Sequence, residues 1–483
     1  KGQGIWISAK LLRGDKDQAA QDYPAIINTR TSIARKLGFP EVIMPGDVRN
    51  DMFITIVAGK FDKGDKTANK NVEMTMRVCD QSGDVIPNVI SLGAGEPLVK
   101  EYRSCVYRHS LTPEWHETVK LVIPIEKFYS SHLTFTFKHR SSNFDKDKSQ
   151  KITNFAYVRL MNLKDGTTLL DGDHDLVVYK CDAKEIKDNS YFKLPSLKSE
   201  LHLPAGTLGK SNALCVGKLT LSQKESFQIS SLLCSTKLTQ NVELLGLLKW
   251  KSQMNNLRVI LPQVTNVKGE EIVKFLQDIF DALFAILMES PDKYGKLVFD
   301  DLVFVINLLA DKKYSHFRPV LDTYIADLFS AAKAHDTLIT VLSGYVMVIT
   351  STEPARLDVV KLDFLFKTMK AIEYIFKLIV RSRLLFERMS NEHNAEKFRD
   401  DLNRLFKVLV LMMSDQRSET LKVQGQALKN IPSIFGHALK VYDPVRLGEF
   451  ARDLITSIPA GRLNSQKLTC IHDMVKSELF ENE

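Results

Sequence analysis

The sequence lacks the features of a disulfide-stabilised, zinc-binding or membrane-spanning protein. Its 6 cysteines are scattered with no Cys-x-x-Cys spacing, which argues against a disulfide framework and against a zinc site. Such cysteine usage is typical of a reducing, cytoplasmic compartment. Apolar runs such as 302–309 and 408–413 fall well short of the roughly 20 residues that cross a bilayer. We therefore expect any membrane contact to be peripheral.

Catalytic motifs are also missing. The sequence has no His-Glu-x-x-His, no Gly-x-Ser-x-Gly and no glycine-rich nucleotide loop. Gly209, Lys210 and Ser211 resemble the end of a phosphate-binding loop, but Pro204 stands where the first glycine of that motif belongs. The histidines between 109 and 174 have no nucleophile at a recognisable offset. We expect no active site, no metal ion and no cofactor in these residues.

A strong excess of one charge is absent as well. The net charge of +8 is mild for 483 residues and argues against a nucleic-acid-binding protein, although it allows one local basic patch. With 44% hydrophobic and 26% charged residues, the composition is that of a globular protein. The length exceeds what one hydrophobic core holds, so we expect several domains.

Residues 46–195 show the alternation of apolar and polar residues that is typical of β-strands. Clusters of Gly, Pro, Asn and Asp bound each run, at the spacing of a two-sheet sandwich. We predict an antiparallel β-sandwich over this range, preceded by a lead-in segment over 1–45. The predicted strands are 52–57, 72–78, 102–107, 118–123, 133–137, 155–160 and 175–179.

The pattern changes after the predicted sandwich. Residues 196–226 are rich in Ser, Gly, Pro and Lys and show no periodicity, which predicts a linker or loop. From 227 to 483, apolar residues recur at i, i+3, i+4 and i+7, and short breaks separate segments of helical length. We predict antiparallel helix pairs stacked as an armadillo- or HEAT-like α-solenoid. The chain as a whole is then multidomain, β followed by α.

Two basic loops adjoin strands of the predicted sandwich. Residues 138–151 hold five Lys or Arg against two Asp, and residues 59–70 hold four Lys against two Asp. If the strand order brings these loops together, they form a cationic cup that can clamp a phosphorylated headgroup, with Arg140 bidentate. Near an anionic membrane each such residue contributes about 1 kcal/mol to binding. The alternative is a pair of solvated turns that keep the protein soluble.

Calcium is the other ligand that these loops suggest. Asp62, Asp65, Asp145 and Asp147 lie in them, and calcium takes about six to eight oxygen ligands, many of them from carboxylates. Each aspartate has lysine neighbours, however, and the summed charge of the loops is positive. Because this charge repels a bare dication, we expect no calcium site.

Longer motifs run through the chain: PGDVRND (45–51), FDKG (61–64), HRSS (139–142), DGTTL (165–169), STKLTQNV (235–242), LLKW (247–250) and VKFLQD (273–278). Together they resemble the dedicator of cytokinesis (DOCK) family, and the resemblance covers essentially the whole chain. PEWHE (113–117) also resembles the Pro-x-Trp-x-Glu turn of many C2 domains.

The resemblance implies a C2-type first DOCK homology region followed by the beginning of an armadillo-like region. In that family the C2-type domain binds phosphatidylinositol 3,4,5-trisphosphate without calcium, through basic residues of its upper loops. Carried over by position, the implied headgroup-binding residues are Lys63, Lys66, Lys70, Arg140, Lys146 and Lys148.

The resemblance also implies that the parent protein is a guanine nucleotide exchange factor for small GTPases in cytoskeletal and motility signalling. The exchange region lies downstream in that family, and contacts to the engulfment-and-motility adaptor lie mainly upstream, so we expect both outside these residues. Residues 91–97 and 293–295 resemble the modifier-of-cell-adhesion branch and 139–142 the founding branch, which leaves Rac and Rap open. We expect a cytoplasmic protein recruited to the plasma membrane. The alternative is a protein-interaction module that does not bind lipid.

Overall fold

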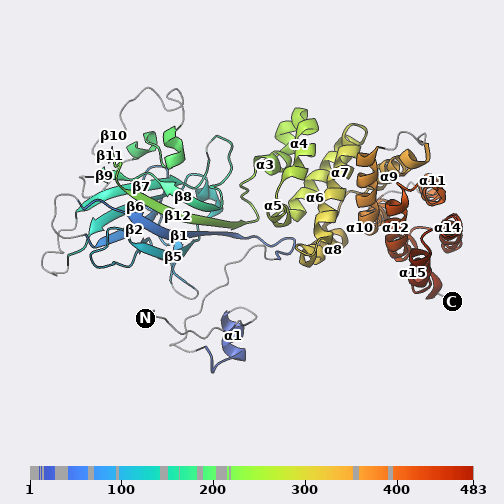
Figure 1. Cartoon of the computed structure of the whole chain (residues 1–483), viewed down its shortest axis with the longest axis horizontal. Coiled ribbons are helices and arrows are strands. Elements are labelled where there is room, and N and C mark those ends of the chain that lie inside the picture. Colours follow the sequence, from blue (N-terminus) through green and yellow to red (C-terminus); the bar gives the residue numbers. More distant parts are fainter. Residues whose placement is uncertain are drawn as a thin grey trace. The chain divides into compact units, whose positions relative to one another are not determined.

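The computed structural model of the chain forms two compact units. The first comprises Lys1–Phe39 and Val48–Gln240, and the second comprises Pro40–Asp47 and Asn241–Glu483. The strands lie in the first unit and most of the helices lie in the second (Figure 1). The residues that the structure describes are 10, 12, 16–27, 42–63, 70–93, 97–141, 151–162, 164–181, 189–202, 215–216, 219–351, 358–389 and 395–481.

The first unit is a sandwich of two antiparallel sheets. One sheet has the strand order β3-β5-β1-β12-β8. Its central strands β1 and β12 pair along most of their length, with Asn50 opposite Ser235 and Lys60 opposite Ser226. The strands are β3 (Ile90–Ser91), β5 (Glu114–Leu121), β1 (Asn50–Lys60), β12 (Ser226–Ser235) and β8 (Gly172–Leu176).

The second sheet has the strand order β10-β11-β9-β7-β6-β2-β4. In the β2–β6 pair, Val72 lies opposite His139, so the start of β2 is beside the end of β6. The strands are β10 (Cys215–Val216), β11 (Leu219–Leu221), β9 (Tyr179–Cys181), β7 (Ile152–Arg159), β6 (His132–His139), β2 (Val72–Cys79) and β4 (Glu101–Arg103). The short helix α2 (Ile125–Phe128) connects β5 to β6.

The sheets enclose one apolar core, because alternate side chains of each strand point to the same face. Phe135, Phe137 and Phe227 are fully buried in it, and the rings of Phe137 and Phe227 meet at 4.9 Å between centroids. A smaller core lies on the other face of the second sheet. There the segment containing the short helices η2 (Ser190–Lys193) and η3 (Lys198–His202) packs on the sheet, and Tyr157 donates its hydroxyl hydrogen to the carbonyl of Leu194 at 2.5 Å.

The sandwich extends further along the chain than the sequence predicts. β10 and β11 lie in the predicted linker 196–226, and all but the first residue of β12 lies in the range 227–483 that was assigned to the solenoid, so both predicted boundaries are wrong. β12 is a central strand, and Phe227, Ile229 and Leu233 fill the core at alternate positions. Ser231 occupies the position in that alternation where another apolar residue belongs. Because of this serine, the segment lacks the regular alternation of apolar and polar residues by which strands are predicted.

The predicted strands 52–57, 72–78, 118–123, 133–137 and 155–160 correspond to β1, β2, β5, β6 and β7. Two predictions are corrected. The run 102–107 forms only the short β4, because the chain leaves the sheet after Arg103. The run 175–179 is divided between β8 in one sheet and β9 in the other. In the predicted lead-in 1–45, α1 (Lys16–Asp22) is described, and most of the remainder lies outside the described residues.

The second unit is a stack of α-helices in its described residues. α6 packs on α7, both α7 and α9 pack on α10, and α10 packs on α12. Because the long helices pack on helices that are close to them in the sequence, this arrangement confirms the predicted α-solenoid (Figure 1). The first half of the stack consists of α3 (Val242–Leu248), η4 (Trp250–Asn256), α4 (Leu257–Gln263), η5 (Val264–Asn266), α5 (Gly269–Lys274), α6 (Leu276–Glu289), α7 (Pro291–Ala310), η6 (Ser315–Phe317), α8 (Arg318–Thr323) and η7 (Tyr324–Leu328).

The stack continues through three long helices and then shorter ones. Asp443 begins α14 by accepting a hydrogen bond from the N–H of Arg446 at 3.0 Å, as a favoured N-cap residue does. None of the described helices is long and apolar enough to cross a membrane. The second half consists of α9 (Ala334–Ser351), α10 (Val359–Met389), α11 (Ala395–Ser414), α12 (Leu421–Asn430), η9 (Ile431–Ile434), α13 (Phe435–Ala438), α14 (Pro444–Thr456), α15 (Asn464–Val475) and α16 (Glu478–Glu481).

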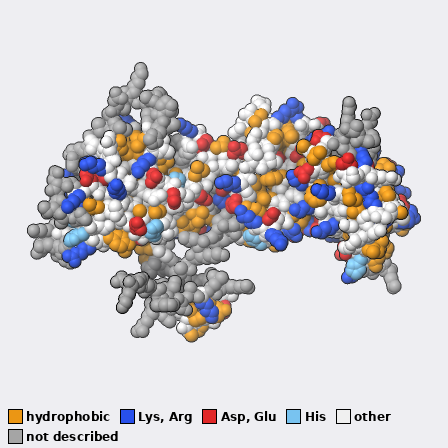
Figure 2. Space-filling view, in the orientation of Figure 1, with side chains coloured by type: hydrophobic (Ala, Val, Ile, Leu, Met, Phe, Trp, Pro, Cys, Tyr) orange, Lys and Arg blue, Asp and Glu red, His pale blue; other side chains and the backbone are white. Residues whose placement is uncertain are grey.

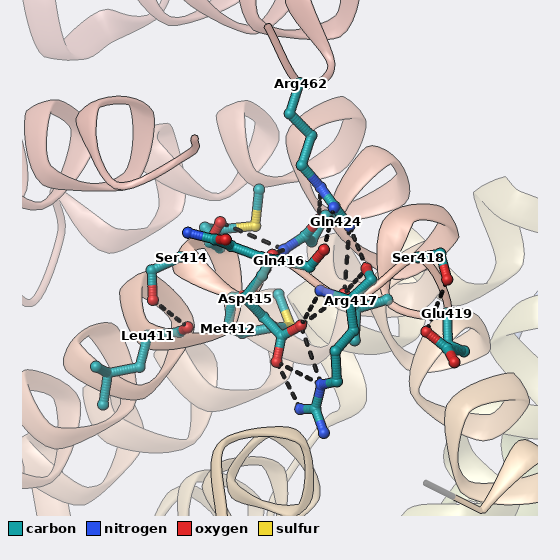
Figure 3. Close-up of polar contacts among 12 residues, drawn as sticks. Leu411, Met412, Ser414, Asp415, Gln416, Arg417, Ser418, Glu419, Gln424 and Arg462 are labelled. Atoms are coloured by element: carbon teal, nitrogen blue, oxygen red, sulfur yellow. Dashed lines mark hydrogen bonds and ion pairs between the residues drawn. The ribbon is translucent and has the colours of Figure 1, made fainter. Parts of the chain in front are cut away.

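A cluster of hydrogen-bonded polar side chains lies at the connection between α11 and α12 (Figure 3). The fully buried Gln424 donates through Nε2 to the carbonyls of Met412 and Asp415 at 2.9 and 2.8 Å. Arg462 reaches in from the connection between α14 and α15 and donates to the carbonyl of Arg417 at 2.5 Å and to Gln424 Oε1 at 3.0 Å. Side chains from α12 and from the connection between α14 and α15 therefore satisfy backbone carbonyls at and beyond the end of α11, which have no partner within that helix.

Candidate functional site

The two basic loops begin and end at the same end of the sandwich. Since Val72 lies opposite His139, the residue before β2 and the residue after β6 are neighbours. Phe61, which follows β1, contacts Phe137 near the end of β6, with 4.9 Å between ring centroids. We name this end the loop pole. Its described residues are 61–63, 70–71, 105–111, 139–141 and 222–225.

Half of the predicted headgroup-binding residues lie in the described part of the chain. Lys70 precedes Asn71 in the chain, and Arg140 forms hydrogen bonds with Asn71, so these two basic residues lie close together. Lys63 is at the same pole, two residues beyond Phe61, and all three basic side chains are half-buried. The remaining predicted residues, Lys66, Lys146 and Lys148, lie outside the described residues.

Asn71 holds three loops of the pole together. Its N–H donates to His139 Nδ1 at 3.0 Å, and its side-chain Nδ2 donates to the carbonyl of Arg140 at 2.9 Å. Its backbone carbonyl accepts from the N–H of Arg140 at 2.8 Å, and its Oδ1 accepts from the N–H of His109 at 2.8 Å. Sequence reasoning missed this residue because His109 and Arg140 lie 38 and 69 positions away. An asparagine before a strand is an ordinary loop residue, so no local signal marks it.

A buried carboxylate neutralises part of the positive charge at the pole. Glu73 of β2 is 6% exposed, and its two oxygens pair with Lys138 Nζ at 2.7 Å and with Arg140 Nη1 at 3.2 Å. Two cations and one anion leave one positive charge in this trio. Glu73 therefore holds the side chain of Arg140 in place. The guanidinium group has more N–H donors than this one carboxylate engages. The pole is less positive than the composition of its loops indicates.

A second buried carboxylate anchors the first basic loop. Glu225, in the turn before β12, accepts from the N–H of Asp62 at 3.1 Å and from Asn154 Nδ2 at 2.5 Å. Glu225 is 5% exposed, so both hydrogen bonds are shielded from water. This contact fixes the position where the chain leaves β1 for the basic loop. Sequence reasoning missed Glu225 as well, since it fell in the predicted linker.

The tryptophan of the PEWHE motif lies beneath a third loop, between β4 and β5. Glu117 accepts from the hydroxyl of Tyr102 at 2.5 Å and from the N–H of Cys105 at 3.0 Å. Burial, and then this hydrogen bond, raise the pKa of Tyr102, and the bond to Glu117 raises the pKa of the Cys105 thiol. Trp115 Nε1 donates to the carbonyl of Cys105 at 2.9 Å. The base of this loop is thus held by Glu117, which accepts two hydrogen bonds, and by Trp115, which donates one.

The four aspartates that were weighed as calcium ligands and rejected are only partly described. Asp62 lies at the loop pole, whereas Asp65, Asp145 and Asp147 lie outside the described residues. Within the described ranges, no three or more His, Cys, Asp or Glu residues are placed to hold a metal ion. On the face shown in Figure 2, basic and acidic side chains are interspersed over both units, in line with the mild net charge.

The fold and its pole define a class of protein, a C2-like β-sandwich with basic loops that is joined to an α-helical region. Residues 45–243 match a family profile described as the C2 domain in Dock180 and Zizimin proteins, and residues 253–483 match the dedicator of cytokinesis (DOCK) TPR region. The chain belongs to the dedicator of cytokinesis family. The first match passes the predicted boundary at 195, as β10, β11 and β12 do. The second names the helical region after TPR repeats, which, like armadillo repeats, are stacked helices.

Two curated relatives align with nearly the whole chain. Human dedicator of cytokinesis protein 3 is 43% identical over 488 residues, which covers 99% of this chain and 23% of the relative. Human dedicator of cytokinesis protein 4 is 41% identical over 490 residues, covering 99% of this chain and 24% of the relative. The chain thus spans about a quarter of their length. A solved structure, a C2 domain of plant extended synaptotagmin 1, aligns with 38% of this chain and 93% of its own at 11% identity and a TM-score of 0.21, too low for a structural conclusion.

Proposed function

We propose that the sandwich recruits its parent protein to phosphatidylinositol 3,4,5-trisphosphate in the plasma membrane, and that the helical unit spaces this lipid site from the remainder of the protein. The observation that carries the proposal is the convergence of the two basic loops at one pole, where Lys70 and Arg140 flank Asn71. We further propose that the parent protein is a cytoplasmic guanine nucleotide exchange factor for Rac-type or Rap GTPases. Its catalytic region and its contact to the engulfment-and-motility adaptor belong to parts outside these residues.

The chemistry of the pole suits a headgroup with several phosphates. Guanidinium binds a phosphate through two parallel hydrogen bonds, and lysine ammonium groups act as point charges. The hydrogen bonds of Asn71 fix the backbone of Arg140 before a ligand arrives, which lowers the entropy cost of binding. The first loop supplies Lys63 and Lys66, and the second is held beside it by Glu73.

The double charge reversal Lys63→Glu/Lys66→Glu is expected to weaken binding to vesicles that contain the trisphosphate by about tenfold or more, because each basic residue near an anionic surface contributes about 1 kcal/mol. Co-sedimentation over a range of lipid concentrations measures this. A matched control is Lys127→Glu/Lys164→Glu, two exposed lysines at the other end of the sandwich, which should bind as wild type does. Equal binding by all three proteins would remove the first loop from the site.

The variant Glu73→Gln is expected to tighten binding of the headgroup about threefold to tenfold, because it keeps the size of the side chain and removes the anion that competes for Arg140. Calorimetric titration with the soluble headgroup measures the change. Glu101→Gln is the control, since Glu101 pairs with Arg77 and Arg103 rather than with a residue of the loop pole. Weaker binding by Glu73→Gln would mean that Glu73 positions Arg140 for the ligand rather than competing with it.

A second candidate function is a protein-interaction module without lipid binding. It is favoured by the face of α15 that carries Leu468, Ile471 and Val475, at the helical spacing i, i+3 and i+7, with exposed fractions of 69%, 40% and 59%. This function predicts that vesicle composition has no effect on the wild-type protein. It also predicts that Leu468→Ser/Val475→Ser abolishes a protein contact that Lys63→Glu/Lys66→Glu leaves intact, measured by affinity capture from cytosol.

A further inference from the structure

The loop between β4 and β5 reaches the same pole as the two basic loops. The N–H of Ser104 donates to the carbonyl of Met74 at 2.9 Å, so the chain leaves β4 alongside β2 and toward its start. At His109 the backbone adopts a left-handed φ of 55°, and its N–H donates to Asn71 Oδ1 at 2.8 Å. The same asparagine binds the backbone of Arg140. Besides the turn 222–225, the pole therefore includes three loops that meet at Asn71, of which only two are basic over most of their length.

This third loop carries apolar side chains in water on a well-anchored base. Val106 and Tyr107 are 41% and 43% exposed. Just before them, the N–H of Cys105 donates to Glu117 Oε1 at 3.0 Å, and the carbonyl of Cys105 accepts from Trp115 Nε1 at 2.9 Å. A loop fixed in this way holds the valine and the tyrosine at the surface and prevents them from folding back into the core. Both side chains therefore stay in contact with water, although burial of their apolar surface would stabilise the protein.

The residues around Val106 and Tyr107 indicate which kind of surface these two side chains contact. Arg108 follows them and is exposed, and Lys70 and Arg140 adjoin the asparagine on which the loop rests. A tyrosine with its hydroxyl at the level of lipid headgroups and its ring among acyl chains, next to basic residues that meet phosphates, suits the interface of an anionic bilayer.

We infer that Val106 and Tyr107 insert into the interfacial layer of the membrane while the basic loops hold the headgroup. The pole then binds the headgroup more tightly in a bilayer than free in solution, and the difference comes from the third loop. This inference rests on the proposed lipid-binding function. It adds an apolar membrane contact that the charges of the loops do not indicate.

The test compares one headgroup in two forms with the whole chain. The variant Val106→Ser/Tyr107→Ser is expected to lose about tenfold in affinity for phosphatidylcholine vesicles that contain phosphatidylinositol 3,4,5-trisphosphate, because two partly buried apolar side chains no longer enter the lipid. Its affinity for soluble inositol 1,3,4,5-tetrakisphosphate should stay within about twofold of wild type. In Tyr107→Trp, brominated lipids should quench the new indole fluorescence beyond that of the wild-type tryptophans.

The chain offers a matched control at the other end of the sandwich. Val122 and Tyr129 are 38% and 51% exposed, and Val122→Ser/Tyr129→Ser should bind both ligands as wild type does. Undiminished vesicle binding by Val106→Ser/Tyr107→Ser would overturn insertion, and so would an equal loss for vesicles and soluble headgroup. Either result leaves the proposed function standing if Lys63→Glu/Lys66→Glu weakens binding to both ligands. Wild-type protein that binds neither ligand would overturn the proposed function and the insertion together.

Discussion

Replacing Arg462 by alanine is expected to lower the free energy of unfolding of the helical unit by about 2–4 kcal/mol, because it removes the donor from several acceptors, one of them on the fully buried Gln424. The guanidinium donates to the carbonyls of Gln416 and Arg417 at 2.7 and 2.5 Å and to Gln424 Oε1 at 3.0 Å (Figure 3). Gln424 is fully buried, so water cannot replace the lost hydrogen bond without opening the stack. Urea unfolding followed by the helical circular dichroism signal measures the loss, since the helices lie mainly in this unit.

The matched control is Arg452→Ala in α14. Arg452 is 67% exposed and pairs with the exposed Asp453, so its removal should change the free energy of unfolding by less than about 0.5 kcal/mol. Arg462→Lys should recover only part of the stability, because an ammonium group lacks the planar fork that reaches several acceptors at once. Similar losses for Arg452→Ala and Arg462→Ala would show that the cluster does not stabilise the stack.

Asp301→Asn is expected to stabilise the protein at neutral pH and to have little effect near pH 4. Asp301 lies in α7 at 1% exposure, and its Oδ2 has no hydrogen-bond partner among the described residues. Burial, and then the charge of Asp300, raise the pKa of the Asp301 carboxyl well above its usual value of 3.8. The folded protein therefore holds a proton that the unfolded chain releases. The contribution of this carboxyl to stability is then greatest below pH 3.8 and falls as the pH rises above that value.

The asparagine variant does not titrate, so its advantage over wild type should grow as the pH rises above the usual carboxyl pKa of 3.8. At neutral pH a gain of about 1–3 kcal/mol is expected, the cost of an uncompensated buried polar group. Urea midpoints at several pH values measure it. Asp363→Asn is the control, because Asp363 is 59% exposed in its pair with Lys367. A difference between Asp301→Asn and wild type that is the same at every pH would point to packing and would contradict the titration.

The secondary structure of most of the chain could be predicted from short-range patterns. β1, β2, β5, β6 and β7 fall where alternation predicts strands, and the second unit is helical where the period is helical. These patterns are local, since they depend only on which side chains share a face of a strand or helix. The prediction failed at β12, where Ser231 interrupts the alternation and the pairing with β1 decides the structure. Its partners there belong to β1, the first strand of the sandwich and far earlier in the chain.

The candidate site was predictable only in part. Charge indicates the two basic loops, because basic residues between strands are visible in the sequence, and the resemblance to the family implies Lys63, Lys70 and Arg140 within them. The residues that arrange them are not visible in this way. Glu73 meets Arg140 across 67 positions, and Glu225 meets Asp62 across 163.

By itself, the sequence determined the order of the units, the period of their elements and the presence of two basic loops, since each of these properties is set by residues close together in the chain. Only the tertiary structure decided that the loops share one pole, that Asn71 joins them to a third loop, and that Glu73 neutralises part of their charge. The physical reason is that antiparallel pairing brings distant residues together. Which carboxylate meets which cation depends on strand register, and register is set by the burial of whole sheets rather than by any short segment.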